Sequence, residues 1–489
     1  GTAYRDFIVV SLADDAKGCA DLVAYFYLRA YLLLADARVF SLIACNTIAE
    51  GDTRQVGLER MMKLGAKIIA AHPNMPWPGS ASVVISPVTI FKGEDWLGEF
   101  LLGNERVTTI SPYLTAQDEW SPRQLVANKG NSYIGSVVIG KGFVLTPEEA
   151  SKYIADNPEN SKVLCPYLNG DDINTSPTQE ATRWIINFYD WPLSRDAKGK
   201  WGDLSDEERK KMVASGTVPR DYPGRVARDF KTLYEIILDK VKPQRDLVKR
   251  DVYRKLWWQY AEKCAALYKA VGRGDTFVRF EGCDCKPIPR VLGCARVSKY
   301  FAPSLIANKG VFQEKVVVII DGSYSNCAFM NSSIIQEWVW AKSSTLGMGL
   351  NFSPSDSYET LPFPVAMSRI LDTLGEQLDD QRHDILTTDQ IGLTQLYNRL
   401  HDESNTATRI VEMRELQVKI DNAVRDAYGW TDIDLGHGFH KVGYLPENDN
   451  IRFTISEPAR IEVLKRLAKL NKERWEEEER AGLHKKGKM

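Results

Sequence analysis

The chain has 489 residues, of which 44% are hydrophobic and 26% are charged, so it is long enough for about three domains with sizeable cores and is not a disordered protein. It contains no run of about 18 apolar residues and no signal-peptide pattern at its start, which argues against a membrane span and favours a cytoplasmic location. The net charge is −2, but residues 191–300 hold 25 Lys and Arg against 15 Asp and Glu, and this local excess is compatible with either a nucleic-acid surface or solvated helical faces.

The first elements are an apolar helix and an apolar strand. Residues 20–36 are apolar at helical spacing and contain neither Gly nor Pro, which predicts a well-buried helix. Residues 38–45 form a short apolar run, and the polar residues Asn46 and Thr47 follow it. This pattern predicts a buried strand that ends at a turn.

A second helix and two further strands follow. Residues 53–64 are amphipathic and are followed by Gly65, which predicts a helix closed by a glycine. Residues 67–72 and 81–91 are two more strand-like runs, separated by a Pro-rich turn. The alternation of helix and strand predicts at least part of a parallel sheet, and the turn permits an antiparallel final pair.

The pattern changes from about residue 106 onward. Short β-like runs alternate with long loops and helices, and residues 222–271 are mostly helical and rich in Lys, Arg and aromatic residues. A helical pattern resumes near Val365 and continues to the end, apart from a Gly- and His-rich stretch at 428–444. These changes predict three regions, 1–105, 106–364 and 365–489.

Several long motifs occur in order along the chain. The early ones are ADLVAYFYLRAYLLL, FSLIACNTIAEGDTRQVGLERMM and PWPGSASVVISPV. They resemble the second half of a class I, Rossmann-like, S-adenosylmethionine-dependent methyltransferase of the gamma-type adenine-N6 group. The run NTIAEGDTR is similar to large methyltransferases of the type IIG/IIL restriction–modification, BREX and DISARM families. Later motifs that resemble the target-recognition domain and tail of that group are NSYIGSVVIGKGFVLTPEEA, VLCPYLNGDDIN, RWIINFYDWP, ARVSKY, FSPSDSYETLPFP and YGWTDIDLGHGFH.

The resemblance implies a fold and a partner. The fold class is α/β plus α+β: a partial Rossmann-like methyltransferase sheet over 1–105, a DNA target-recognition domain over 106–364 and a helical C-terminal region over 365–489. The implied activity of the intact protein is methylation of adenine N6 in double-stranded DNA, in phage defence or restriction–modification, with S-adenosylmethionine as the cofactor.

Two motifs of that group are absent from this sequence. It contains neither the Gly-rich cofactor turn nor the catalytic Asn/Asp-Pro-Pro-Phe/Tyr loop, so we expect no catalytic residue in this chain. The resemblance places residue 1 just downstream of that loop. The chain is therefore expected to supply mainly target recognition, with the catalytic and cofactor-binding part in an upstream segment or a separate subunit.

A flipped adenine needs a lid on its free face. The resemblance assigns this lid to the strand near residues 82–91 or to the turn before it, where Ser86, Pro87 and Trp77 are the candidates. Trp77 is the nearest large ring, and the alternative is that it only packs the Pro-rich turn.

Cofactor-binding candidates lie at a helix start and a strand end. The resemblance places the helix that begins at Asp21 beside the cofactor, although Asp21 could equally be an N-cap. Asn46 follows the carboxyl end of a strand, where open α/β sheets bind ligands. Arg54 could contact a DNA phosphate, whereas Asp52 or Thr53 is expected to cap its helix.

The DNA-binding candidates form two groups in the basic middle of the chain. Charged and aromatic residues alternate on one predicted helix, where Trp257 and Trp258 cannot both face DNA at helical spacing. A second group lies on the short extended piece ARVSKY and could reach phosphates or base edges. The candidates are Arg254, Lys255 and Trp257 in the first group and Arg296, Ser298, Lys299 and Tyr300 in the second.

We expect no metal site. The cysteines at 283, 285 and 294 lack a usual zinc spacing and a nearby fourth ligand, and they are interpreted as reduced thiols in a variable loop. Asp434, His437 and His440 lie in one Gly-rich stretch, which is more typical of a turn than of a metal centre.

Three hypotheses follow. The chain is the recognition half of an adenine-N6 methyltransferase, or it is a non-catalytic DNA-specificity subunit that docks on a separate methyltransferase chain. The second is favoured by an apolar sheet edge that needs a partner. The third, an RNA-modifying enzyme, has no RNA-binding signature to support it.

Overall fold

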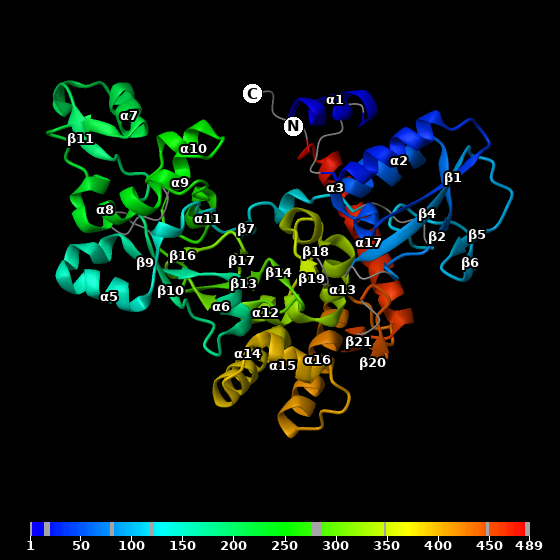
Figure 1. The fold of residues 1–489 in the computed structure, drawn as a ribbon. Helices are drawn as coiled ribbons and strands as arrows, with labels where there is room; N and C mark the ends of the chain where they lie inside the picture. The colour runs from blue at the N-terminus through cyan, green and yellow to red at the C-terminus, as the bar shows by residue number, and fades with distance from the viewer. Residues whose placement is uncertain are drawn as a thin grey trace.

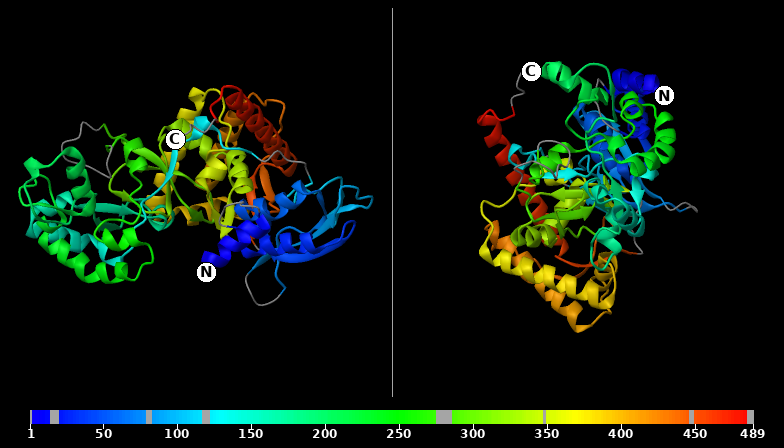
Figure 2. Two further views of the ribbon diagram at one scale, coloured as in Figure 1. Left: turned by 90° about the horizontal axis from the view of Figure 1, so that it is seen from above. Right: turned by 90° about the vertical axis from the view of Figure 1, so that its left-hand side faces the viewer.

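The computed structural model describes residues 2–13, 20–78, 83–116, 122–274, 286–346, 349–445 and 449–484. Figure 1 shows three bodies side by side, with the N-terminal sheet at one end, the body that carries α5 and α7–α11 at the other, and a central body between them. The view from above in Figure 2 gives the same order. Each body has its own buried apolar cluster. None of the described helices is both long enough and apolar enough to span a bilayer.

The N-terminal body is a sheet with helices on one face. Its elements are α1 (Thr2–Ala13), α2 (Leu22–Leu33), β1 (Val39–Cys45), η1 (Asn46–Ala49), α3 (Gly51–Arg54), η2 (Gln55–Glu59), α4 (Arg60–Lys63), β2 (Ala66–Ala71), β3 (Met75–Pro76), β4 (Val84–Lys92), β5 (Phe100–Leu102) and β6 (Glu105–Val107). The strand order is β1-β4-β2-β5-β6, with β3 paired to β4. Strand β4 is antiparallel to both β1 and β2, whereas β2 and β5 are parallel. The expected antiparallel final pair and partial parallel sheet are confirmed.

The helix expected at 53–64 begins slightly earlier. It runs without interruption from α3 through the π-turn η2 to α4, and Leu64 caps it. Gly65 follows with φ 91°, a left-handed conformation that a glycine adopts without strain. The prediction that a glycine closes this helix is confirmed.

The expectation that α2 and β1 are well buried is wrong. Helix α2 buries Tyr27 and Leu28 in the N-terminal core, but Phe26 on its other face is 67% exposed. Strand β1 is an edge strand, and Ile43 on its open face is 59% exposed. A continuous apolar run is typical of an element covered on both faces, and the described chain covers only one. The uncovered side chains form what we call the apolar edge surface, namely Tyr4, Phe7 and Val10 of α1, Phe26 and Leu33 of α2, and Val39 and Ile43 of β1.

The second body combines small sheets with short helices. Its elements are η4 (Lys141–Phe143), β8 (Val144–Leu145), α5 (Pro147–Asp156), η5 (Pro158–Lys162), β9 (Leu164–Leu168), α6 (Gly170–Thr175), β10 (Arg183–Ile186), β11 (Ser194–Ala197), η6 (Trp201–Asp203), α7 (Asp206–Ser215), β12 (Thr217–Pro219), η7 (Ala227–Asp229), α8 (Lys231–Lys240), α9 (Lys242–Asp246), α10 (Asp251–Lys255), α11 (Ala265–Ala270) and β16 (Val311–Phe312). Strands β16, β9, β10 and β8 form one sheet, and β11 pairs with β12.

The central body begins with strands and ends with long helices. Its elements are η3 (Val126–Asn128), β7 (Ser132–Ile134), β13 (Arg290–Ala295), β14 (Val297–Ser298), β15 (Ser304–Ala307), β17 (Val316–Ile319), α12 (Tyr324–Asn331), α13 (Ser333–Lys342), β18 (Ser344–Leu346), β19 (Gly349–Asn351), η8 (Pro354–Tyr358), α14 (Arg369–Asp389), α15 (Leu393–Leu400), α16 (Thr408–Ala427), β20 (Gly438–Lys441), β21 (Ile451–Thr454) and α17 (Glu457–Arg480).

One sheet joins the second and central bodies. Strands β15, β13, β17 and β7 pair in that order. Because side chains alternate along a strand, Val316 and Val318 of β17 lie in the second core, whereas Val317 and Ile319 lie in the central core. The central core also combines α12 and α13 with α14 to α17, so the predicted boundary at residue 364 passes through one packed unit.

Candidate nucleic-acid interface

A cavity lies between the N-terminal sheet and the central body. We call it the Asn46 cavity. Its volume is about 470 Å³, which is within the range of small-molecule sites. Asn46 and Glu50 enter it from the end of β1, and Ser86 enters it from β4. The opposite wall comes from the end of α13 and from α17, including Lys342 and Arg460. The structure therefore brings two candidate residues of the N-terminal body, Asn46 and Ser86, to one interdomain cavity.

A polar network across this cavity joins the two bodies. The Asn46 side-chain amide donates to Glu50 Oε1 and to Thr345 Oγ1, each at 3.1 Å. The Glu50 carboxylate also accepts from the backbone N–H of Thr345 at 2.9 Å. Burial raises the pKa of Glu50 to about 6, and the hydrogen bonds from Thr345 oppose this shift. Glu50 therefore links the N-terminal sheet to the β18 segment through hydrogen bonds.

The three residues assigned to the target-base lid do not converge. Ser86 is buried, and its Oγ accepts from the backbone N–H of Asn74 at 3.3 Å. Pro87 pairs opposite Ile43, on the face of the sheet that is open. Trp77 follows β3, is partly exposed, and donates its backbone N–H to the Val83 carbonyl at 2.9 Å. Of these three residues, Ser86 lines the Asn46 cavity, whereas Trp77 and Pro87 do not.

Asp21 is an N-cap. Its side chain accepts from the backbone N–H of Val23, at the first turn of α2. Its own backbone N–H donates to Thr53 Oγ1 at 3.1 Å. The N-cap of α3 is Glu50, so the prediction that Asp52 or Thr53 occupies that position is wrong. Thr53 instead holds the start of α2, a contact that its position in the sequence does not indicate.

The described residues do not form a complete cofactor site. Asp21 lies at the start of α2, and it does not line the cavity that Asn46 lines. The backbone donors that a Gly-rich turn offers to a cofactor are absent from this sequence.

Arg54 points into a second cavity, which we call the Arg54 cavity. Its volume is about 400 Å³, and it shares Glu50, Tyr113 and Lys342 with the Asn46 cavity. Only 6% of Arg54 is exposed, and its guanidinium carbon lies 3.8 Å from the centre of the Tyr113 ring. The Lys342 ammonium lies 4.5 Å from the centre of the same ring. Sequence reasoning found Arg54 but missed Tyr113 and Lys342, because no local pattern connects residues so far apart.

Arg254 and Lys255 share one carboxylate. Both pair with Asp251 of the same helix, at 2.5 and 2.8 Å respectively. Arg254 also donates to the carbonyls of Val248 and Lys249. Lys255 remains 75% exposed along its side chain, so it is the one of the pair that projects from the surface.

Trp257 does not project from the surface. Its ring is 6% exposed and lies in the second core, beside the buried ring of Trp258. The indole N–H of Trp258 donates to the Trp191 carbonyl at 2.9 Å. The prediction that Trp257 contacts DNA is therefore corrected: both rings serve packing, because the short helix α10 ends at Lys255 and a turn carries both of them inward.

The ARVSKY residues contact the second body and the C-terminal helices of the central body. Ser298 Oγ accepts from the Asn174 amide at 3.1 Å. Lys299 contacts Asn398 and Asp449, each at 2.9 Å. The Tyr300 hydroxyl donates to Asn398 at 2.8 Å, and its ring packs on Tyr397 and His401. Asn398 and Tyr397 belong to α15, so Lys299 and Tyr300 form an internal interface with that helix.

Arg296 lies at the same junction. Its backbone N–H donates to the Lys315 carbonyl, and its carbonyl accepts from the Phe352 N–H, each at 2.7 Å. The guanidinium Nε is buried and has no hydrogen-bond partner. Like its neighbours, Arg296 is therefore held among the strands of the central body.

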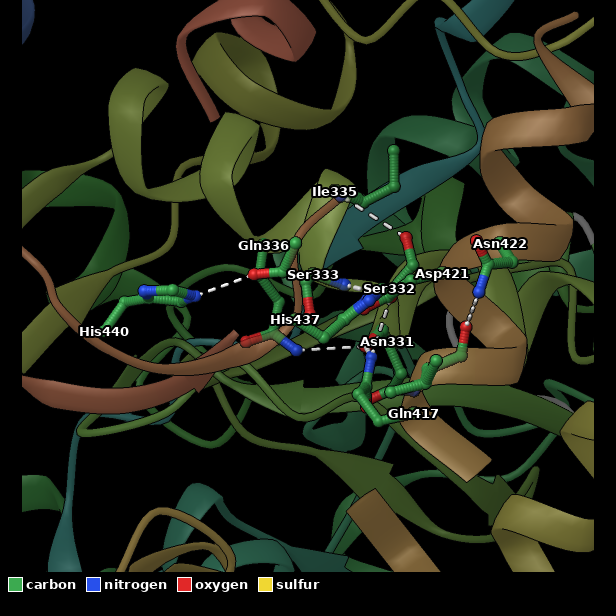
Figure 3. A network of polar contacts seen from close by, with 12 residues as sticks. Asn331, Ser332, Ser333, Ile335, Gln336, Gln417, Asp421, Asn422, His437 and His440 are labelled. Carbon is green, nitrogen blue, oxygen red and sulfur yellow. Dashed lines mark hydrogen bonds and ion pairs between the residues drawn. The ribbon is translucent and has the colours of Figure 1, made fainter. Parts of the chain in front are cut away.

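The His-rich stretch is an irregular segment that leads into β20, and a buried carboxylate holds it. The His437 ring contacts Asp421 at 2.9 Å, and the His440 ring donates to the Gly436 carbonyl at 2.8 Å (Figure 3). Asp434 accepts from the backbone N–H of Gly436. Within the described ranges, no three His, Cys, Asp or Glu side chains are placed to hold a metal ion. Cys283 and Cys285 fall outside those ranges, and Cys294 is buried in β13.

Comparison with known proteins finds a similar fold among solved structures. No family model and no curated protein match the sequence. The type IIL restriction–modification enzyme MmeI, solved in complex with DNA, is similar with a TM-score of 0.60 and 16% identity, over 93% of this chain and 52% of the MmeI chain. The type IIG restriction endonuclease BpuSI gives a TM-score of 0.27 and 10% identity over 84% of this chain and 50% of its own, a likeness too weak to support an argument. The chain has the fold of part of MmeI and spans about half of its length.

Proposed function

We propose that this chain is the DNA-recognition part of a site-specific DNA methyltransferase of the restriction–modification kind, which transfers a methyl group to adenine N6. The observation that carries the proposal is the shared fold over 93% of the chain with MmeI, an enzyme solved in complex with DNA. The order of the sequence motifs supports the finer assignment to adenine N6. When bound to the intact protein, S-adenosylmethionine would supply the methyl group.

The apolar edge surface supports the view that this sheet has a partner. Strand β1 lies at the edge of its sheet, and exposed apolar side chains occur on it and on the helices α1 and α2. An apolar edge of this kind is normally covered, because it can pair with another strand. We propose that the covering element is the cofactor-binding and catalytic part of the methyltransferase, which carries the two motifs absent from this chain.

The Asn46 cavity is the proposed position at which this chain approaches the target base. It lies at the carboxyl end of β1, where open α/β sheets bind their ligands. Asn46 and Glu50 offer an amide and a carboxylate there, and both are already held in place by Thr345. A fixed acceptor suits an exocyclic amine, which donates hydrogen bonds from an extrahelical base.

The test is methyl transfer by the reassembled enzyme. The chain is expressed together with the preceding coding sequence or with a protein that carries the missing motifs, and duplex DNA is digested and analysed for N6-methyladenine. We expect methylation at one adenine in a defined site, and none from this chain alone. A reassembled protein that methylates no DNA contradicts the proposal. Preferential methylation of structured RNA would instead favour the RNA-modifying hypothesis.

A second candidate function is a non-catalytic specificity subunit. It is favoured by the same apolar edge surface, which a separate chain could cover as well as an upstream segment. Co-expression with a protein that carries the missing motifs should then give a stable complex. Replacement of the exposed Ile43 by Lys should disrupt this complex without unfolding the chain, whereas a monomer that captures no such protein argues against the subunit.

A further inference from the structure

We infer that the Arg54 cavity binds a phosphate group of duplex DNA, with Arg54 and Lys342 as the cations that contact it. The inference rests on the proposed DNA-binding function and adds a specific phosphate site between two bodies. Arg54 comes from the N-terminal body, and Lys342 ends α13 of the central body. A phosphate held by both would join the two bodies to the same stretch of DNA backbone.

Arg54 is a buried cation with incomplete compensation. It is 6% exposed and lines the cavity, and its Nε has no hydrogen-bond partner. Its ion-pair partner is Glu59 at 3.7 Å, but that carboxylate is closer to Lys63, at 2.9 Å. A buried cation and an unsatisfied donor both cost free energy unless an anion approaches. A phosphate oxygen in the cavity would satisfy the guanidinium at a point that the described protein leaves open.

Lys342 adds a second positive charge to the lining of the same cavity. Both its ammonium and the Arg54 guanidinium lie within 4.5 Å of the centre of the Tyr113 ring. The ring stabilises each cation weakly, but it does not remove the repulsion between two like charges. An anion bound in the cavity that both cations line lowers this repulsion. Because the Arg54 guanidinium covers Tyr113 at 3.8 Å, that ring face is not open to a stacked base, and the site favours a phosphate over a nucleobase.

The acidic residues of the cavity are held by donors of their own. The Glu50 carboxylate accepts from Thr345 and Asn46, and burial raises its pKa to about 6. Asp356 accepts from the hydroxyl of Ser353 at 2.7 Å. Each carboxylate is therefore held in position by hydrogen bonds within the protein.

Further basic groups surround the cavity. Arg123 stacks on Trp475 at 4.1 Å and lines the cavity. Lys129 lines the same cavity. Basic side chains that line one cavity are suited to a polyanion, because each neutralised phosphate releases counterions from DNA.

The test measures how the binding of a 30-base-pair duplex depends on salt. The variants are Arg54→Gln and Lys342→Gln. The matched control is Lys63→Gln, which removes one positive charge from the same continuous helix. Like Arg54, the Lys63 side chain contacts Glu59, but it is 72% exposed. Fluorescence anisotropy gives the dissociation constant at several NaCl concentrations between 50 and 200 mM, and thermal unfolding confirms that each variant is folded.

Log affinity falls with log salt concentration, and the loss of one phosphate contact makes this slope less steep by about 0.9. We therefore expect the affinity ratio of wild type to Arg54→Gln to fall about 3.5-fold between 50 and 200 mM salt, with a similar result for Lys342→Gln and none for Lys63→Gln. If Arg54→Gln does not fold, the Lys342 variant decides.

Unchanged slopes in folded variants, beside normal binding by the wild type, overturn the phosphate site and leave the proposed function standing. Arg54-dependent binding of inorganic phosphate with an unchanged DNA slope would also overturn it, in favour of a site for free phosphate. A wild-type chain that binds no duplex at 50 mM salt overturns the proposed function, and the site with it.

Discussion

Removal of the buried Asp421 carboxylate should loosen the helix that carries Lys342. Asp421 is fully buried on α16. It accepts from the backbone N–H of Ser333 at 2.7 Å, from the Gln417 amide at 2.9 Å and from the His437 ring at 2.9 Å (Figure 3). Ser333 is the first residue of α13, and Lys342 is its last. The carboxylate therefore anchors one end of the helix whose other end forms the cavity wall.

The magnitude follows from the donors that lose their acceptor. In Asp421→Ala, the N–H of Ser333 and the amide of Gln417 stay in buried positions, and each unsatisfied donor costs about 1–3 kcal/mol. His437 is partly exposed and can turn towards water, so it adds less. We expect a local loss of about 3–5 kcal/mol, which is at the upper end for a single substitution.

Hydrogen–deuterium exchange with mass spectrometry measures this loss directly. A loss of about 3 kcal/mol corresponds to roughly 150-fold faster exchange in peptides that cover α13 and α16, if these helices open locally. The matched control is Asp434→Ala, which removes an exposed carboxylate from the turn that holds His437 and should change stability by about 1 kcal/mol or less. Exchange of α13 in Asp421→Ala within fivefold of the wild type would refute this reasoning.

Three further results are expected. Phe26→Ser, on the apolar edge surface, should change the free energy of unfolding by about 0.5 kcal/mol or less but should weaken co-purification with the proposed catalytic partner. Leu28→Ala in the same helix should cost about 2–5 kcal/mol in thermal unfolding, and equal destabilisation by both variants would contradict the exposure of Phe26. Trp257→Ala should cost about 3–5 kcal/mol, and Lys255→Gln should leave stability unchanged; a stable Trp257 variant with weakened DNA binding would restore the surface assignment. Burial raises the pKa of Glu337 from 4.5 to about 7, so the folded chain holds this proton more tightly than the unfolded chain, and the free energy of unfolding should fall as the pH rises from about 4.5 to about 7. Between pH 5 and pH 8, the free energy of unfolding should fall by up to about 3 kcal/mol less in Glu337→Gln than in the wild type. Identical pH profiles of the two proteins would count against a buried acid at this position.

The sequence determined the local elements of the N-terminal body. The spacing of apolar residues predicted α2, β1, β2 and β4. Gly65 marked the end of the helix that closes with α4, and Asp21 was recognised as a possible N-cap of α2. Short-range periodicity, caps and glycine conformation are properties of neighbouring residues, so they can be recognised without the fold. The Pro-rich segment between these strands was expected to permit the antiparallel pairing that β4 makes with β2.

Only the tertiary structure decided which apolar and charged residues are accessible. Helix α2 and strand β1 were expected to be buried, yet each has an exposed apolar face. An apolar pattern indicates that an element is stable when other residues cover it, but the pattern does not show whether such residues are present. Trp257 was expected at a surface but lies in a core, and Lys299 and Tyr300 contact residues about a hundred positions away. The meeting of Arg54, Tyr113 and Lys342 depends on how two bodies pack, which no local pattern of residues records.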